Sequence, residues 1–341
     1  MFANLYDIVQ YTLPKALKIP LILLGSLLGL ALLLLLVAQT AWFKNYASYK
    51  ATNYLSKELG VPVSIGEVSL SYFDELKAED VYIEDQHHDT LIYIKTLKAD
   101  YDVFSFTNEE VKLNHVFIAE GNIQIGVPQD SSSLNIQFLI DYFSPPPSGK
   151  PSSSPTLVFD QVEITDTRFR YFNSNYISPT SRSFDENNMV FSQLNGHLHD
   201  FTIIKDSISF ALDDIRGAEK SGLTIEDLHA QTIISSTTME FTDLYLQTPQ
   251  STLRDYLRFS YSSYADFSDF YSKVNLKTNL TKSSIHTDDL AYFYTDLRRY
   301  NEMIKGTGTI TGTVDNLASN KLHLELGTHT QFTGSAVVKG L

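Results

Sequence analysis

Residues 97–103 read LKADYDV, and this stretch decides the class of fold. The apolar residues are Leu97, Ala99, Tyr101 and Val103, and every residue between them is charged. Successive side chains of a β-strand point to opposite faces of its sheet, so strict alternation is typical of a strand with one buried face. The stretch therefore predicts a strand with one apolar face and one charged face.

The same alternation extends through residues 60–126. Apolar residues recur at every second position in runs of about 5–8 residues, a common strand length. Short polar segments such as 86–89 separate the runs, as turns do between antiparallel strands. We therefore expect a first antiparallel sheet segment over 60–126, in which Val81 and Ile83 join the apolar face of 97–103.

Residues 127–155 interrupt the strand pattern. Leu134, Phe138 and Tyr142 are spaced by four residues, which predicts a short helix. The run SPPPSGKPSSSP at 144–155 follows, and its proline and serine content favours a linker or an exposed loop.

Strand patterns resume in residues 156–341, which we expect to form a second segment of the same sheet. Thr287 is followed by Asp288 and Asp289, and acidic residues favour the positive end of a helix, so a helix is predicted near 287–304. The chain ends within a strand pattern, and native proteins avoid an unprotected strand edge. We interpret the chain as the N-terminal piece of a longer polypeptide.

Residues 19–38 carry no charge and would form a helix of about 30 Å, which matches the hydrocarbon core of a bilayer. The alternative is a cleaved signal peptide, but its apolar run would be shorter and would end at a small-x-small site, which 38–41 matches poorly. We expect an uncleaved transmembrane helix. Positive charges do not decide the orientation, but the large acidic body favours a cytoplasmic segment at 1–18.

Residues 43–59 contain neither glycine nor proline and end at Gly60. The apolar positions that recur at helical spacing are Phe43, Ala47, Ala51 and Tyr54. Polar residues, Ser48 and Ser56 among them, lie off this stripe. The pattern predicts a short amphipathic helix with Gly60 as its C-terminal stop.

The composition excludes several classes of protein. A content of 43% hydrophobic and 12% aromatic residues is that of a folded chain, since disordered chains are poor in aromatic residues. The net charge of −14 leaves no basic stripe to neutralise phosphates, so nucleic acid is not an expected partner. The absence of cysteine excludes disulfides, thiol catalysis and cysteine-based metal sites.

Histidine and aspartate clusters give little support for a metal site. Residues 87–89 (His-His-Asp) are adjacent, and neighbours in a strand point to opposite faces, so a solvated turn is the better interpretation. His197 and His199 share a face, with Asp200 nearby, but two nitrogens without a third ligand favour a simple pair on a sheet. The pair Asp213-Asp214 is interpreted as a turn.

Motifs of nucleotide binding and hydrolysis do not occur. The glycines of 306–312 lack the GxGxxG spacing and precede a strand rather than a helix. No GxSxG, HExxH or GxxxxGK[ST] is present. We assign no catalytic residue, no metal ligand and no cofactor, and we do not expect an enzyme.

The order of these features resembles the N-terminal part of a TamB-like protein of the AsmA-like superfamily, of the type found in Bacteroidota. The resemblance covers roughly residues 15–341. It rests on a repeated pattern of strands and turns rather than on invariant chemical residues. The segments that carry it, besides the N-terminal span, are LGVPVSIGEVSLSYFDELKAEDVYIEDQHHDTLIYIKTLKADYDV, FIAEGNIQI, LNIQFLIDYF, LNGHLHDFTI, SGLTIEDLHA, LRFSYSSYADFSDF, DLAYFYTDL and GTGTITGTVDNL.

The resemblance implies a fold, a location and a function. The fold would be mainly β: an elongated, twisted antiparallel sheet curved into an open groove, with an N-terminal transmembrane helix and a few short helices. A single pass would hold the chain in the inner membrane, with its bulk in the periplasm. Such proteins conduct phospholipids between the inner and outer membranes. The residues that would line the groove here are Val81, Ile83, Leu97, Ala99, Tyr101 and Val103.

Three functions remain open at this point. The first is a lipid conduit. The second is an assembly factor for outer-membrane proteins, which would meet a TamA-type barrel partner through a C-terminal region missing from this chain. The third is a membrane-tethered scaffold that transports nothing. The apolar face could also be covered by a second sheet and the short helices, which would exclude an open groove.

Overall fold

The computed structural model describes residues 26, 29, 36–71, 75–101, 110–143, 156–177, 184–204 and 207–340. The predicted cytoplasmic segment 1–18 lies outside the described residues, and so does most of the predicted span 19–38. Within the part of the chain that is described, no helix has both the length and the hydrophobicity needed to cross a bilayer.

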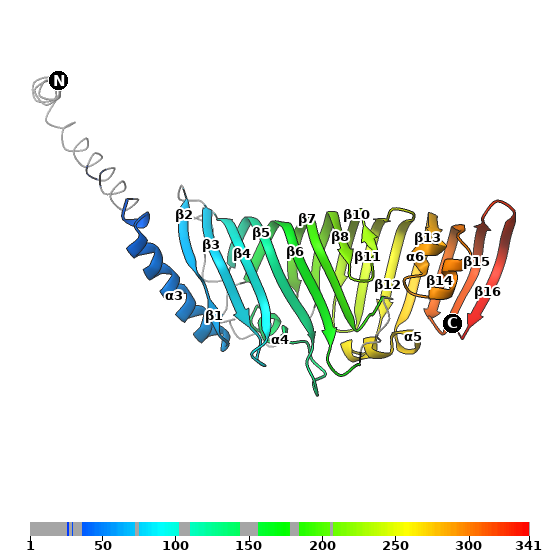
Figure 1. Cartoon of the computed structure of the whole chain (residues 1–341), viewed down its shortest axis with the longest axis horizontal. Coiled ribbons are helices and arrows are strands. Elements are labelled where there is room, and N and C mark those ends of the chain that lie inside the picture. The colour runs from blue at the N-terminus through cyan, green and yellow to red at the C-terminus, as the bar shows by residue number, and fades with distance from the viewer. Residues whose placement is uncertain are drawn as a thin grey trace, which may run out of the picture.

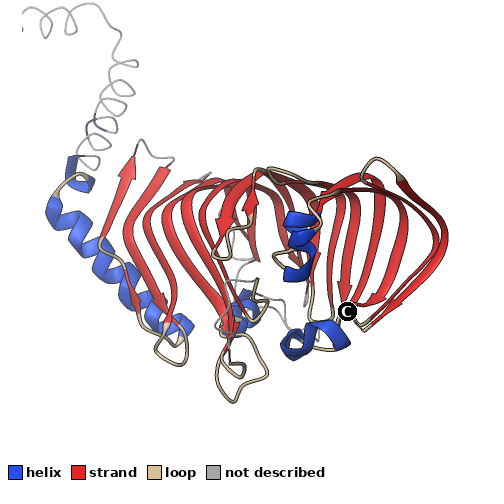
Figure 2. Ribbon diagram, turned by 45° about the vertical axis from the view of Figure 1, so that its right-hand side comes forward, coloured by secondary structure: helices blue, strands red, loops and turns tan. Residues whose placement is uncertain are grey.

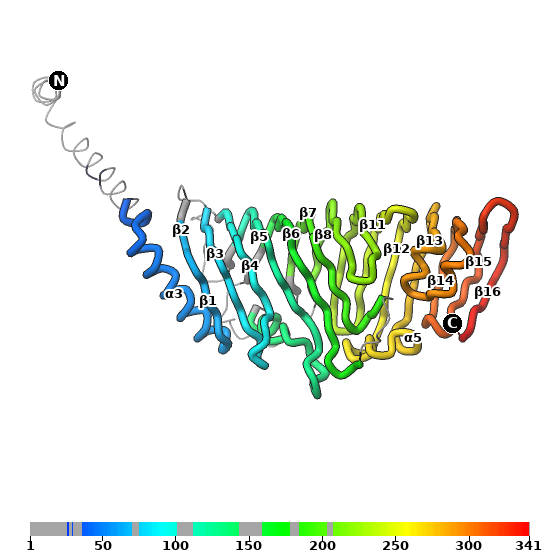
Figure 3. Tube along the Cα trace, in the orientation of Figure 1, coloured from blue at the N-terminus to red at the C-terminus, as the bar shows by residue number. Residues whose placement is uncertain are grey.

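The described chain is mainly β, and its sixteen strands form one long, open, curved sheet (Figure 1). Figure 3 follows the chain as it steps along the sheet from α3 to β16. The strands of the first half are β1 Val63–Ser64, β2 Glu67–Ser71, β3 Glu75–Glu84, β4 Thr90–Tyr101, β5 Glu110–Val127, β6 Thr156–Asn173, β7 Asn188–Ile204 and β8 Ser207–Glu219. Those of the second half are β9 Thr224–Ile225, β10 Asp227–Ile234, β11 Thr238–Gln247, β12 Thr252–Ser260, β13 Asn275–His286, β14 Met303–Thr313, β15 Asn316–Leu326 and β16 Thr330–Lys339.

Short helices accompany the sheet (Figure 2). They are α3 Ala41–Leu59, α4 Gln137–Phe143, the 3-10 helix η1 Tyr264–Asp269, α5 Phe270–Lys273, α6 Thr287–Leu290 and the 3-10 helix η2 Thr295–Arg299. The helix predicted near 287–304 is therefore wrong in length. It begins at Thr287 as expected, but it breaks into α6 and η2, and the imidazole of His286 accepts the hydrogen bond of the first turn from the Asp288 N–H.

The prediction of an entirely antiparallel sheet is wrong at one pair of strands. β5 and β6 run parallel, with Val116 opposite Val162 and Ile118 opposite Ile164. A parallel neighbour needs a connection long enough to return the chain to the starting end of the first strand. The connection that includes α4 and the run 144–155 supplies that length, although 144–155 itself lies outside the described residues.

A line of exposed residues with left-handed backbone crosses the sheet. Their φ angles are positive, and they are Asp80, Glu120, Asp166, Asp214, Asp243, Asp255 and Lys282. In β3 the alternation breaks at this line, because Ala78 and Val81 pack in the same apolar cluster although three positions separate them. Two consecutive side chains, those of Glu79 and Asp80, therefore turn to the polar face. We call this line the crease, and such irregularities bend and twist a strand.

The helix α3 covers the first edge of the sheet through a stripe of hydroxyl groups. The backbone N–H of Val68 donates to Ser48 Oγ at 2.8 Å, that of Ile65 to Thr52 Oγ1 at 3.1 Å, and that of Val63 to Ser56 Oγ at 3.0 Å. Ser48, Thr52 and Ser56 are spaced by four residues and so lie on one face of the helix. They satisfy donors that the edge of a sheet otherwise leaves unpaired.

The predicted apolar stripe of this helix is partly wrong. Ser48, which the pattern predicts to lie off the stripe, is only 5% exposed, whereas Tyr54, which it predicts to lie on the stripe, is 61% exposed. The face of α3 that meets the sheet carries hydroxyl groups because the sheet edge presents backbone N–H donors rather than an apolar surface. The predicted stop is confirmed, since Gly60 caps the helix with a left-handed backbone and donates its N–H to Ser56 O.

Replacing Ser48 tests the role of α3 at the sheet edge. In S48A the Val68 N–H loses its acceptor in a part-buried place, and an unsatisfied donor costs about 1–2 kcal/mol. We expect a lower midpoint of urea unfolding and faster amide exchange in β2. The matched control is N53A, because Asn53 lies on the exposed face and bonds only within the helix. Equal effects of the two substitutions would contradict the assignment.

Candidate functional site

The predicted lining residues of β3 and β4 share one face of the sheet. Val81 lies opposite Ile94, and Ile83 lies opposite Ile92. Leu97 lies opposite Ala78 on β3 and Ile118 on β5. Ala99, Val81 and Ile94 are all less than 10% exposed. Packing of these side chains against one another therefore forms an apolar strip across the first three long strands.

The last two predicted lining residues are not placed in the same way. Tyr101 is the final residue of β4, where its backbone lies opposite Leu113. Val103 lies outside the described residues. The structure thus places four of the six predicted lining residues, Val81, Ile83, Leu97 and Ala99, on the apolar strip.

Apolar residues continue on the same face along the rest of the sheet. In each neighbouring pair of strands, apolar side chains stand opposite one another or opposite a small residue. Examples in chain order are Val162 and Leu198, Leu198 and Leu212, Met239 and Phe259, Phe259 and Leu276, Ile285 and Ile304, and Leu324 and Phe332. We call this surface the apolar face. All sixteen described strands belong to its sheet, so no second sheet packs on it within the described chain.

A row of aromatic rings crosses the apolar face near the middle of the sheet. The row starts at Phe259 on β12 and passes to Phe270 in α5, with ring centroids 5.7 Å apart. Phe270 lies 6.0 Å from Phe267 in η1, and Phe267 lies 6.5 Å from Tyr171 near the end of β6. We call these four rings the aromatic bridge. It joins β12 to β6, so the sheet must curve toward its apolar face.

A second segment crosses beside the aromatic bridge. It contains α6 and η2, and it reaches back to the connections that follow β6 and β8. The N–H of Phe184 donates to Tyr292 O at 2.9 Å, and the Tyr292 hydroxyl donates to Gly222 O at 3.0 Å. The hydroxyl of Tyr271 in α5 donates to Phe293 O at 3.4 Å, which links the two crossings. Helical segments therefore cover the middle of the apolar face.

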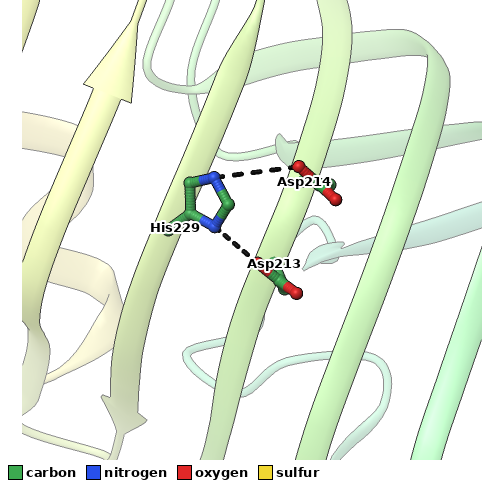
Figure 4. A group of neighbouring side chains, drawn as sticks. All are labelled: Asp213, Asp214 and His229. Atoms are coloured by element: carbon green, nitrogen blue, oxygen red, sulfur yellow. Dashed lines mark hydrogen bonds and ion pairs between the residues drawn. The ribbon is translucent and has the colours of Figure 1, made fainter.

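On the polar face, the crease brings acidic and imidazole groups together (Figure 4). Asp213 and Asp214 are adjacent in β8, yet both approach His229 of β10. Nδ1 of His229 lies 2.5 Å from an oxygen of Asp213, and Nε2 lies 3.8 Å from an oxygen of Asp214. Nε2 also lies 2.8 Å from Asp227. The interpretation of Asp213-Asp214 as a turn is therefore wrong, because a strand that creases can turn two neighbours to one face.

This cluster binds a proton better than a metal ion. Single ligand atoms of Asp213, Asp214 and His229 lie within 4.8 Å of one another, which is close enough for one cation. However, both ring nitrogens of His229 face carboxylates, and a metal requires an imidazole nitrogen free of its proton. Burial lowers the pKa of His229, but the hydrogen bonds to Asp227 and Asp213 offset that effect and leave the pKa above its usual value. We assign the cluster as an ion pair between β8 and β10.

The two other histidine groups that the sequence analysis considers lie where it predicts them. His197 and His199 share the polar face of β7, where their rings stack with centroids 6.1 Å apart. Asp200 is exposed and has a positive φ of 54°. Residues 87–89 lie in an exposed turn, as predicted. The buried group of that turn is Asp85, which accepts hydrogen bonds from the backbone N–H groups of residues 87 and 89.

Neither a scan of protein-family models nor a search of curated proteins returns a match for this chain. The resemblance to TamB-like proteins therefore stays a prediction, and the geometry of the two faces carries the functional argument.

Replacing His229 tests the proton-binding cluster. A histidine whose pKa is raised by folding adds stability that is complete below its unfolded pKa near 6.5 and is lost as the pH rises through the folded pKa. H229Q should therefore destabilise the protein at about pH 5.5 and have little effect at about pH 8.5. A third of the side chain is exposed, so screening limits the effect to roughly 0.5 kcal/mol.

Chemical denaturation at both pH values measures this difference. The control is H87Q, which replaces a histidine of the exposed turn and gives the effect of a His-to-Gln substitution itself at each pH. A destabilisation by H229Q that is equal at both pH values would contradict the ion pair.

Proposed function

We propose that this chain conducts phospholipids along its apolar face, between the inner and the outer membrane, and that it is not an enzyme. The observation that carries the proposal is the apolar face itself. It continues over neighbouring strands from β3 to β16, and no second sheet covers it in the described part of the chain. A core that served stability alone would bury such a surface from end to end.

The physical basis is the cost of moving acyl chains through water. Each CH₂ group gains about 0.8 kcal/mol on burial, so a chain of about sixteen carbons gains roughly 12 kcal/mol. An apolar surface that is continuous along the path removes most of that barrier. Strands are spaced by about 4.8 Å, so the sheet extends the surface over roughly 60 Å, which is more than the thickness of a hydrocarbon core.

The polar face suits the aqueous side of such a conduit. Charged pairs connect neighbouring strands there, such as Lys95 with Glu120 and Lys112 with Asp160. These groups remain solvated while the other face stays dry. Because one face is polar and the other apolar, the sheet could extend through the periplasm without packing its apolar face against another domain.

The N-terminal segment would bring the sheet to the inner membrane, from which the lipid would come. Residues 19–38 would anchor the chain in the inner membrane, and α3 follows them directly and meets the first edge of the sheet. The exposed side of α3 carries Trp42, Tyr46 and Tyr49. Aromatic residues of this kind are common at the boundary between a membrane and water. The start of the apolar face would then lie at the membrane surface.

Photo-crosslinking tests the proposed function. A small diazirine amino acid at Val81 or Leu97 would face the apolar side, whereas the same group at Tyr82 or Lys98 would face the polar side. The protein is purified from membranes after irradiation and examined by mass spectrometry for phospholipid adducts. We expect adducts from the first two positions and a severalfold lower yield from the second two.

The matched positions make the result decisive. Each control is the sequence neighbour of a test position, so the strand, the depth along the sheet and the local stability are the same. Equal yields on both faces, or no adduct from either apolar position, would overturn lipid conduction.

A further inference from the structure

We infer that the aromatic bridge is a gate that divides the apolar face into two acyl-chain compartments and must open for a lipid to pass between them. The inference rests on the proposed function and adds to it a point of control. The first compartment lies over β3 to β6, and the second lies over β13 to β16. The bridge runs from Tyr171 on β6 to Phe259 on β12 and so lies between them, and the Tyr271 hydroxyl bonds it to the segment that contains α6 and η2.

The bridge occupies the surface that an acyl chain would need. Phe259 stands on the apolar face, opposite Met239 on one side and Leu276 on the other. At the other end Tyr171 stands opposite Ile125 and Met189. Phe270 and Phe267 fill the space between these two points with ring contacts. An acyl chain that followed the apolar face from β6 to β12 would meet these rings.

The contacts that hold the bridge to β6 are ring contacts without a polar lock. Tyr171 and Phe267 meet edge to face. The Tyr171 hydroxyl is buried and has no hydrogen-bond partner among the described residues, and burial raises the pKa of this phenol to about 12. Opening would return that hydroxyl to water and so relieve an unfavourable burial. The bridge is therefore weakest at its β6 end.

The β12 end of the bridge is fixed. Tyr261 is only 6% exposed, and its hydroxyl donates to Ser235 O at 2.7 Å. At the other chain end of the segment 261–273, Val274 directly precedes β13 and is fully buried. Hydrogen bonds also hold the C-terminal half of the segment, since the Asp315 N–H donates to Tyr271 O at 3.1 Å and the Ser272 hydroxyl donates to Asp315 at 2.8 Å. Only the contact between Phe267 and Tyr171 is made by rings alone. The Phe267 ring can therefore move away from β6 while both ends of the segment and the sheet stay in place.

A reversible chemical lock tests the gate. The chain contains no cysteine, so Y171C/F267C provides the only two thiols. A short bifunctional thiol reagent then joins the bridge to β6, and a reductant releases it. The full chain is reconstituted in vesicles of phosphatidylethanolamine and phosphatidylglycerol. A diazirine at Leu97 reports on the first compartment, and one at Leu324 reports on the second.

We expect the lock to leave lipid adducts at Leu97 unchanged and to lower those at Leu324 severalfold, with recovery after reduction. The controls are the single variants Y171C and F267C, which the same reagent modifies but cannot join to a second thiol. In neither control should the reagent change the two yields.

Two results would overturn the inference, and they differ from each other. If the Y171C/F267C lock leaves the Leu324 adduct unchanged while Leu97 is labelled, the bridge is not a gate, although lipid conduction stands. If neither Leu97 nor Leu324 yields a lipid adduct before locking, the proposed function itself fails.

Discussion

The crease is the constraint on which the rest of the structure depends. A strand whose apolar and polar residues alternate strictly keeps its apolar side chains on one face. Alternation alone does not make the strand bend at a particular residue. At the crease a residue with left-handed backbone turns two consecutive side chains outward and lets the apolar pattern resume on the same face. Asp80 does this in β3, and Asp214 does it in β8. Left-handed backbone is unfavourable for most residues, but short polar side chains such as aspartate tolerate it.

Much of the fold follows from local patterns in the sequence. The alternation of Leu97 and Ala99 predicts their place on the apolar face correctly, and Gly60 ends the helix α3 at the predicted position. The crease could also have been found, because the apolar positions of β3 change from even numbers at Ala78 to odd numbers at Val81. In a sequence, such a change of parity resembles a turn between two strands. The pair Asp213-Asp214 lies at the same kind of change, which is why a turn is predicted there although β8 continues through it.

Other features depend on contacts between distant parts of the chain. Whether β5 and β6 run parallel depends on where the connection after α4 returns, which the residues of that connection do not specify. The stripe of Ser48 in α3 has meaning only beside a sheet edge with free N–H groups. The aromatic bridge joins Tyr171 to Phe267, and nothing local to either ring identifies the other as its partner. The acid cluster at His229 likewise requires the register of β8 and β10.

An open apolar face must be protected from water and from other chains without being closed permanently. Large exposed apolar surfaces promote association, and free sheet edges promote strand pairing. Here α3 covers one edge with hydroxyl groups, and short aromatic segments cover the middle of the face. Rings and acyl chains offer an apolar surface similar dispersion contacts, so exchanging one cover for the other changes the free energy little. A second sheet would resist such exchange, because its backbone hydrogen bonds and its many side-chain contacts would have to be lost together. Cover by a few rings on a short segment is therefore the form of protection that remains compatible with a moving apolar ligand.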